Sequence, residues 1–275
     1  MRIWYQLLSS ETGMKNSIAA TQALATKAAA AGTTVEVRGT REGALGDNYR
    51  LFWHYDVREV IANGLKIREL NREQAGKSVG GGGYDAFVIA NSLEPGIVEL
   101  REMLDIPVLS FMEVSCFHAC TMGEKFALVV PNEKFVPRYR EIAISYGLRD
   151  RLASVDFVPM TNIRDFDTVF TDPAAGDQLR DAVLAAARRC IARGAEVIIC
   201  PGPSTALMAS RGIYEVDGAP ILDSYSLLVK MAEAAVAMHK LTGVAISRKG
   251  LYQSPPTDLV KKAAAIHDIG PLKNG

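Results

Sequence analysis

Short apolar runs alternate with amphipathic stretches along the whole chain. In the first half, the apolar runs have the length of strands buried on both faces and cover residues 3–8, 34–37, 87–90 and 107–111. The stretches between them carry helical patterns over residues 15–31, 51–74 and 96–104. This order of strand and helix is typical of a parallel sheet with helices on both faces.

The second half of the chain repeats this order. The predicted strands cover residues 126–130, 155–158, 197–200 and 220–222, and the predicted helices cover 137–146, 174–193, 204–211 and 225–241. The repeat extends to single positions, because residues 83–88 align with 194–199 and residues 107–109 align with 220–222. We therefore predict an α/β fold of two pseudo-symmetric lobes, each a four-stranded parallel sheet flanked by helices.

The repeat also predicts the domain organisation. Residues 1–122 form the first lobe, residues 123–235 form the second, and residues 236–275 hold a C-terminal helix that packs back on the first lobe. Ligands of open α/β sheets bind at the carboxyl ends of the strands. Two facing lobes would therefore enclose a site between these ends, where the alignment makes Asn91 and Gly202 equivalent.

Charge and hydropathy narrow the classes of partner. The 275 residues contain 31 Lys plus Arg and 31 Asp plus Glu, so no general basic field attracts nucleic acid. No apolar run approaches the roughly 20 residues of a membrane-spanning helix, and the N-terminal segment is typical of a first strand rather than a secretory signal. These features predict a cytoplasmic protein that binds neither nucleic acid nor membranes.

Neither a nucleotide cofactor nor a metal is indicated. The glycine run at residues 80–83 precedes a strand, whereas a phosphate-binding loop follows a strand and opens a helix. No Walker or Rossmann fingerprint is present. Cys116, His118 and Cys120 match none of the usual zinc spacings, so we interpret both cysteines as reduced core residues of a helix.

Several segments carry a family pattern. They read VIANSLEPGI at residues 88–97, GAEVII at 194–199, HYD at 54–56, PILD at 220–223 and KMAEA at 230–234. In order and spacing, over most of the chain, they resemble hydantoin and allantoin racemases of the aspartate/glutamate racemase superfamily. The resemblance implies a cofactor-independent enzyme that acts on a small molecule between its lobes, and it implies a homo-oligomer.

The departures from the family concern the two strand ends. The resemblance implies two cysteines, one per lobe, of which one thiolate removes a proton from the substrate carbon while the opposing thiol returns one. The first position holds Asn91 and the second Gly202, and neither transfers a proton. The family's NPNT motif is replaced by residues 7–10, in which Ser9 and Ser10 retain hydroxyls. Two-thiol racemisation is therefore not predicted.

Three nearby residues are candidates to replace the lost thiols. Cys200 is a candidate nucleophile or acid, and a buried strand residue is the equally weighted alternative. Glu113, which we place at the end of the fourth strand, and Glu94 are candidates to position water. The alternatives are a solvated or capping carboxylate for Glu113 and, for Glu94, a cap of the helix that follows Gly96.

Asn91 and the backbone N–H groups of Ser204 and Thr205 are candidates to hold an oxyanion, because a helix N-terminus offers free donors. The full set of candidate substrate-binding residues is Ser9, Ser10, His54, Tyr55, Ser92, Gly202, Ser204 and Thr205.

The sequence supports three functions. We favour hydrolysis or elimination on a hydantoin-like or thiohydantoin-like ring or a carboxylate. The first alternative is a racemase or isomerase in which Cys200 and Ser92 replace the paired thiols. The second alternative is a small-molecule binding module without catalytic activity.

Overall fold

Two parallel sheets form the framework of the computed structural model, which describes residues 1–43, 49–74 and 82–269. The first sheet and its helices comprise, in chain order, β1 (Arg2–Ser10), α1 (Lys15–Ala28), β2 (Thr34–Thr40), α2 (Arg50–Gln74), β3 (Ala86–Ile89), α3 (Ile97–Met103), β4 (Val108–Ser110) and α4 (Phe111–Met122). Part of the glycine run at 80–83 lies outside the described residues.

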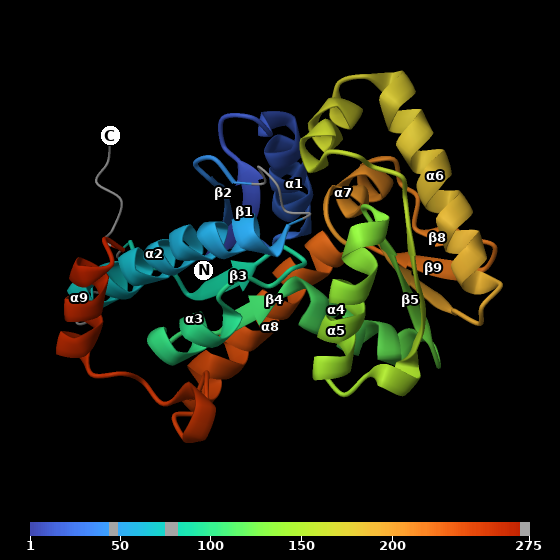
Figure 1. Ribbon diagram of the computed structural model, residues 1–275. Helices are drawn as coiled ribbons and strands as arrows, with labels where there is room; N and C mark the ends of the chain where they lie inside the picture. The colour runs from blue at the N-terminus through green and yellow to red at the C-terminus, as the bar shows by residue number, and fades with distance from the viewer. Residues whose placement is uncertain (44–48, 75–81, 270–275) are drawn as a thin grey trace.

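The chain continues into the second sheet and then returns to the first. Its elements are β5 (Phe126–Val130), η1 (Glu133–Phe135), α5 (Val136–Ser145), η2 (Arg149–Arg151), β6 (Leu152–Phe157), η3 (Ile163–Phe170), α6 (Pro173–Ile191), β7 (Val197–Ile199), α7 (Pro203–Ser210), β8 (Glu215–Val216), β9 (Ala219–Leu222), α8 (Ser224–Thr242), η4 (Gly250–Tyr252) and α9 (Thr257–Ile266). Figure 1 shows the two sheets side by side, each with its own helices.

Strand order confirms the predicted fold class. The first sheet has the order β2-β1-β3-β4, and its neighbouring strands are parallel. The second has the order β6-β5-β7-β9-β8, in which the first four strands are parallel. The fifth strand, β8, is an antiparallel addition to the predicted four. It has two residues, which is too short for an alternating pattern to predict it.

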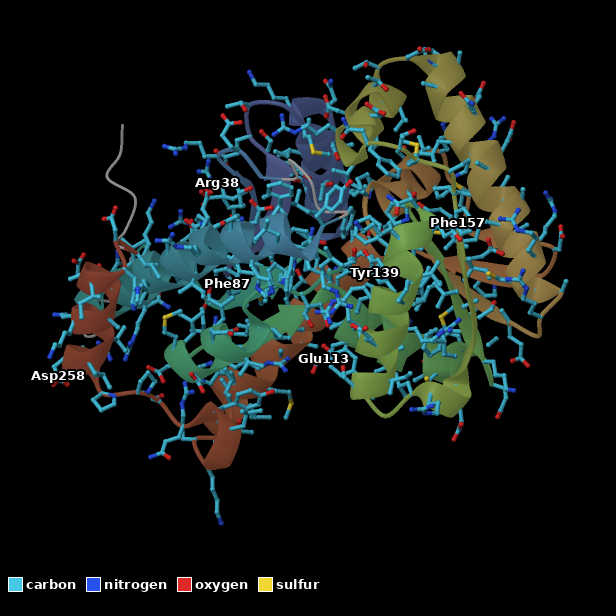
Figure 2. The ribbon with its side chains drawn as sticks, viewed as in Figure 1. Arg38, Phe87, Glu113, Tyr139, Phe157 and Asp258 are labelled. Carbon is cyan, nitrogen blue, oxygen red and sulfur yellow. The ribbon has the colours of Figure 1, made fainter. Side chains whose placement is uncertain are left out.

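The strands divide their side chains between a shared core and two outer cores. Along β7, Val197 and Ile199 join the core that lies between the lobes, whereas Ile198 packs in the outer core of the second lobe. The strands β1, β3 and β5 alternate in the same way. Figure 2 shows Phe87 in the first lobe, Phe157 in the second and Tyr139 between them. The parity of a residue along its strand therefore decides whether its side chain reaches the space between the lobes.

The helices between the sheets connect the lobes. Helix α8 follows β9 of the second sheet, then packs against α1, α4 and the strands β3 and β4 of the first. Val260 and Ala264 of α9 pack against the outer core of the first lobe. The predicted boundary between residues 235 and 236 thus falls inside the continuous helix α8, and the division into domains stays a prediction. None of the described helices is both long and apolar enough to cross a membrane.

Candidate functional site

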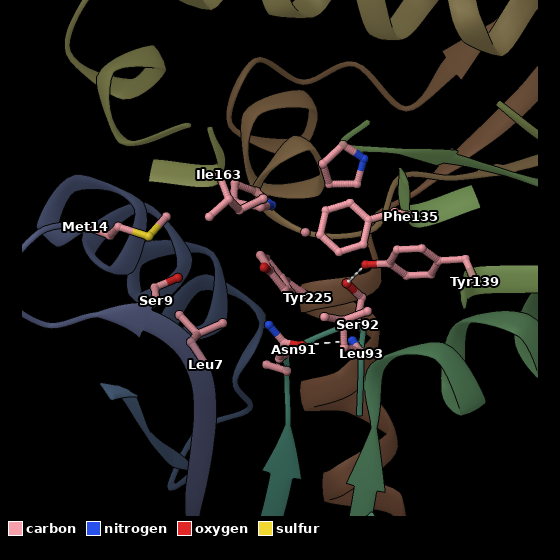
Figure 3. A pocket seen from close by; sticks show the side chains of 14 residues that line it. Leu7, Ser9, Met14, Asn91, Ser92, Leu93, Phe135, Tyr139, Ile163 and Tyr225 are labelled. Atoms are coloured by element: carbon pink, nitrogen blue, oxygen red, sulfur yellow. Dashed lines mark hydrogen bonds between the residues drawn. The ribbon is translucent and has the colours of Figure 1, made fainter. Parts of the chain in front are cut away.

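A cavity lies where the carboxyl ends of strands from both lobes meet. It is narrow: the space open to the centre of a water molecule is about 30 Å³, within about 470 Å³ of space between atoms that includes open solvent. Its lining residues come mainly from the end of β1 and from the segments that follow β3, β5 and β7: Leu7, Ser9, Met14, Ala90, Asn91, Ser92, Leu93, Pro131, Phe135, Tyr139, Ile163, Gly202, Pro203 and Tyr225. Asn91 and Gly202, the two positions that the repeat makes equivalent, thus border the same cavity (Figure 3).

The segment that follows β3 forms a tight turn. The backbone N–H of Glu94 donates to the carbonyl of Asn91 at 3.1 Å, and the N–H of Leu93 donates to Asn91 Oδ1 at 2.8 Å. Asparagine favours such turns because its side chain bonds the backbone two residues on. Because Oδ1 accepts this bond, the amide nitrogen of Asn91 is directed to the cavity (Figure 3), where it can donate to a substrate oxygen.

A pair of hydroxyls joins the two lobes at the edge of the cavity. Ser92 Oγ, from the first lobe, lies 2.5 Å from Tyr139 Oη, from helix α5 of the second, and either atom can be the donor. Both side chains are buried. The opposite side is formed by Leu7, Ser9 and Met14 (Figure 3). The polar pair therefore borders one side of the cavity.

Tyr225, the second residue of helix α8, supplies another wall. Its backbone carbonyl accepts a bond from Tyr5 Oη at 3.0 Å, and the edge of its ring contacts Tyr5 and Phe111. Burial, aided by the charge of Asp223, raises the pKa of the Tyr225 hydroxyl. At neutral pH this hydroxyl is therefore a hydrogen-bonding group and not a base.

The strand end of the second lobe offers fewer functional groups. Gly202 has φ +77° and ψ −157°, a conformation that residues with a side chain rarely adopt. Pro203 begins helix α7 and has no N–H to donate. The N–H of Thr205 donates to the carbonyl of Gly202 at 3.1 Å, and its hydroxyl donates to the carbonyl of Cys200. Ser204 and Thr205 are buried, and neither residue lines the cavity. The backbone N–H groups of Ser204 and Thr205, which we expected to hold an oxyanion, therefore do not border the cavity.

Cys200 lies on the opposite face of the sheet from the cavity. Its side chain is completely buried and packs with Ile198 and Met208 in the outer core of the second lobe. Burial raises the pKa of the thiol to about 12. Of the two interpretations of Cys200, its position agrees with the buried strand residue, because it follows the alternation of β7 away from the shared core.

Glu113 lies in a helix and not at the end of a strand. Strand β4 ends at Ser110, which has an extended backbone, and α4 begins at Phe111, so Glu113 stands in the first helical turn. Arg101 Nη1 and Nη2 donate to its two carboxylate oxygens at 3.1 and 2.5 Å. Glu113 is outside the lining of the cavity, and this ion pair holds its carboxylate away from a water-positioning role.

Glu94 caps helix α4. Its Oε1 accepts the backbone N–H of Glu113 at 2.9 Å, and its Oε2 accepts the hydroxyl of Tyr146 at 2.5 Å. Helix α3 begins after Gly96 and has no side-chain cap, so the expected cap of that helix is wrong. Glu94 has φ +56° and is buried, and the burial raises the pKa of its carboxyl. This carboxylate connects the turn at Asn91 to both lobes.

The other predicted residues divide between the cavity and its surroundings. Ser9 and Ser92 line the cavity, whereas Ser10 is buried beside it and bonds Thr12 Oγ1 at 3.0 Å and the N–H of Gly13 at 3.0 Å. His54 and Tyr55 are exposed on α2, outside the lining. No described lining side chain is a thiol, an imidazole or a carboxylate.

Sequence reasoning missed Tyr139, Tyr225, Met14 and Ile163. Tyr139 and Phe135 are four residues apart, a spacing that places both on one helix face, and this was the signal that could have found them. Ile163 begins an irregular 3₁₀ segment whose path the apolar pattern does not predict. Within the described ranges, no three His, Cys, Asp or Glu side chains converge as metal ligands.

Comparisons with known proteins agree with the fold. A hydantoin racemase of Pseudomonas sp. (strain NS671) is 31% identical over 58% of this chain, and the match spans 61% of that relative's length. Among solved structures, an allantoin racemase from Klebsiella pneumoniae has a TM-score of 0.76 at 22% identity and covers 94% of each chain. One from Pseudomonas fluorescens has a TM-score of 0.73 at 21% identity, covering 93% of this chain and 97% of the other.

The structural likeness, at this level of identity, concerns the fold. Family membership follows from a separate match, because the family model described as Asp/Glu/Hydantoin racemase fits residues 67–232, which is more than half of the chain. This region includes Asn91 and Gly202, so the match holds although neither position carries a cysteine. The chain belongs to the Asp/Glu/Hydantoin racemase family.

Proposed function

We propose that the protein acts on a small hydantoin-like cyclic amide in the cavity between its lobes, by proton transfer on one side of the ring. The observation that carries this proposal is the Ser92–Tyr139 hydroxyl pair beside Asn91. In this scheme Asn91 Nδ2 donates to a ring carbonyl oxygen. The ionised hydroxyl of the pair takes the proton from the adjacent ring carbon, and the other hydroxyl donates a hydrogen bond to it.

Racemisation needs a second proton donor on the opposite side of the carbon. Leu7, Ser9 and Met14 border that side, where the hydroxyl of Ser9 has no second hydroxyl beside it among these three residues, and the position equivalent to Asn91 is Gly202, which has no side chain. The carbanion is therefore reprotonated from the side on which it formed. If the neighbouring carbon carries a leaving group, the same carbanion expels it, and the reaction becomes an elimination.

In this scheme neither Glu94 nor Glu113 positions a water molecule for hydrolysis. Glu113 is bound to Arg101, and Glu94 accepts bonds from Tyr146 and from the start of α4. Because the base in this scheme is the ionised form of a hydroxyl, the rate should rise with pH across the range in which the fold is stable.

The test uses one enantiomer of 5-methylhydantoin in D₂O with the full-length protein. We expect loss of the C5–H signal in proton NMR above the rate of a buffer blank, with little inversion on chiral chromatography and no ring-opened product in mass spectrometry. Exchange accompanied by inversion at the same rate would mean that protons are exchanged on both sides, and ring opening would establish hydrolysis.

Tyr139→Phe tests the assignment of the hydroxyl pair. Because the substitution removes the shared hydroxyl, we expect the exchange rate to fall at least tenfold, within the range typical of a general acid–base group. Tyr214→Phe is the matched control, since Tyr214 bonds the carbonyl of Ala209 far from the lining. Equal losses in the two variants, or none in Tyr139→Phe, would contradict the assignment.

A binding module without catalytic activity is the second candidate. The observation that favours it is the absence of thiols, imidazoles and carboxylates among the described lining side chains. Such a protein would be stabilised saturably by the same hydantoin and would exchange no C5 proton beyond the blank. A cytoplasmic location and a homo-oligomeric state also stay predictions.

A further inference from the structure

A second cavity adjoins the first and is lined by cationic side chains. The space open to the centre of a water molecule is about 230 Å³, within about 630 Å³ that includes open solvent. Its lining residues are Arg50, Trp53, Leu93, Lys134, Phe135, Pro137 and Arg138. Leu93 and Phe135 line both cavities, so the two spaces are neighbours across these side chains. None of the described residues that line the second cavity is acidic.

The three cations stand at the beginnings of two helices. Arg50 is the first residue of α2, Arg138 is the third residue of α5, and Lys134 lies in the 3₁₀ turn that precedes α5. Neither α2 nor α5 has an acidic residue in its first turn. The N-terminal end of a helix carries partial positive charge, so basic residues there oppose the helix dipole. Helix stability therefore does not explain this arrangement.

Two of these cations, Arg50 and Arg138, contact the same carboxylate. Arg50 Nη2 donates to the oxygens of Glu141 at 2.9 and 2.7 Å, and Arg138 Nη1 lies 3.6 Å from the same carboxylate. Lys134 Nζ lies 3.6 Å from the centre of the Tyr49 ring. These contacts give the two arginines one shared carboxylate and give Lys134 an aromatic ring, so the three positive charges face one negative charge. An anion in the cavity would offset the excess.

The wall formed by Trp53 adds a second observation. Its ring lines the cavity, and the guanidinium of Arg138 lies over the ring at 5.2 Å from the centre. The indole N–H of Trp53 is buried without an acceptor among the described residues. A buried donor without a partner costs free energy, so this wall of the cavity holds one donor that lacks an acceptor among the described residues.

We propose that the second cavity is a carboxylate subsite, so that the substrate is a cyclic amide with a carboxyalkyl substituent; this rests on the proposed function. The ring occupies the first cavity beside Asn91 and Ser92. The substituent passes Leu93 and Phe135, and its carboxylate is bound by Lys134 and Arg138. Guanidinium groups suit a carboxylate because their planar donors match its two oxygens.

The experiment compares two ligands that differ in charge, 5-(2-carboxyethyl)hydantoin and its primary carboxamide, by titration calorimetry at low salt. We expect the carboxylate to bind about tenfold more tightly than the carboxamide, because charge-assisted hydrogen bonds are the stronger kind. Lys134→Gln and Arg138→Gln should each reduce this preference several-fold, because each substitution weakens carboxylate binding more than carboxamide binding. Lys262→Gln, on the distant α9, is the matched control.

Glutarate, titrated separately, distinguishes this proposal from the proposed function. Equal binding of the two hydantoins by the wild type would overturn the subsite and leave the proposed function intact. A carboxylate preference that survives both Lys134→Gln and Arg138→Gln would overturn its location. Glutarate binding that needs Lys134, together with no binding of either hydantoin, would support the subsite and overturn the proposed function. No binding of any of the three would overturn both.

Discussion

The two strand ends that meet in the cavity differ in how much functional chemistry they hold. After β3, Asn91 directs an amide to the cavity, Ser92 shares a hydrogen bond with Tyr139, and Glu94 holds the turn against α4. After β7, the equivalent segment contributes Gly202 and Pro203 to the lining. The lobes repeat one architecture, yet polar side chains are concentrated at one of the two ends.

The two lobes therefore share a backbone architecture and differ in the functional side chains at their strand ends. The family reaction, as the resemblance implies it, needs one proton-transfer group from each lobe. Here Gly202 follows β7 of the second lobe as Asn91 follows β3 of the first, but it gives no side chain. A symmetric scaffold can therefore support an asymmetric site, in which the first lobe holds the polar groups and the second contributes Tyr139 from a helix.

The largest effect should come from breaking the turn of the first lobe with Glu94→Ala. The change leaves the Glu113 N–H and the Tyr146 hydroxyl without their acceptor. Each unpaired buried group costs about 1–3 kcal/mol, so we expect a loss of about 3 kcal/mol in the free energy of unfolding, measured in urea. A loss below about 1 kcal/mol would mean that Glu94 does not hold the turn.

Glu94→Gln sharpens this test through pH. Burial, with a smaller contribution from the charge of Glu113, raises the pKa of the Glu94 carboxyl in the folded state. A group with a raised folded pKa contributes stability below its unfolded pKa of about 4.3, and this contribution is lost as pH rises through the folded value. The stability of the wild type relative to Glu94→Gln should therefore fall between pH 4 and pH 7. A constant or rising difference would contradict this.

The apolar pattern of the sequence predicted the architecture that the two strand ends share. Both sheets and the meeting of Asn91 with Gly202 follow from runs of buried residues and from the internal repeat. The predictions that were wrong concern single residues, because they depend on where a strand ends and on which face of the sheet a side chain lies. Ending β4 at Ser110 moves Glu113 into a helix, and the parity of β7 turns Cys200 away from the cavity. Tyr139 reaches the site through the docking of α5, which no local pattern specifies.

Gly202→Ala tests the bare end of the second lobe. An added Cβ would have its nearest neighbour at 3.8 Å, Cγ of Pro131, so space is sufficient. The backbone conformation, with ψ near −157°, is nevertheless almost restricted to glycine, and we expect a loss of about 2 kcal/mol in urea unfolding. The same cost would accompany Gly202→Cys, so restoring the family thiol also requires a change of the turn.

Gly147→Ala is the control for this substitution. Gly147 also has a positive φ, of +76°, and nothing lies within 4 Å of its added Cβ. We expect a loss of about 1 kcal/mol there, as for an ordinary left-handed position. If Gly202→Ala is as stable as the wild type, the empty position reflects no backbone constraint, and a side chain at this end becomes feasible.

The smallest effect on activity should follow Cys200→Ala. The thiol lies in the outer core of the second lobe, so we expect C5–H exchange within about twofold of the wild type and a loss of about 1 kcal/mol in stability from the small cavity.

Thiol titration of the native wild type gives an independent measurement. With a pKa of about 12, only about one Cys200 in ten thousand is a thiolate at pH 8. Half-buried Cys120 should therefore react first, and Cys200 only on unfolding. Rapid labelling of Cys200, with loss of exchange in Cys200→Ala, would show that the second lobe contributes a thiol.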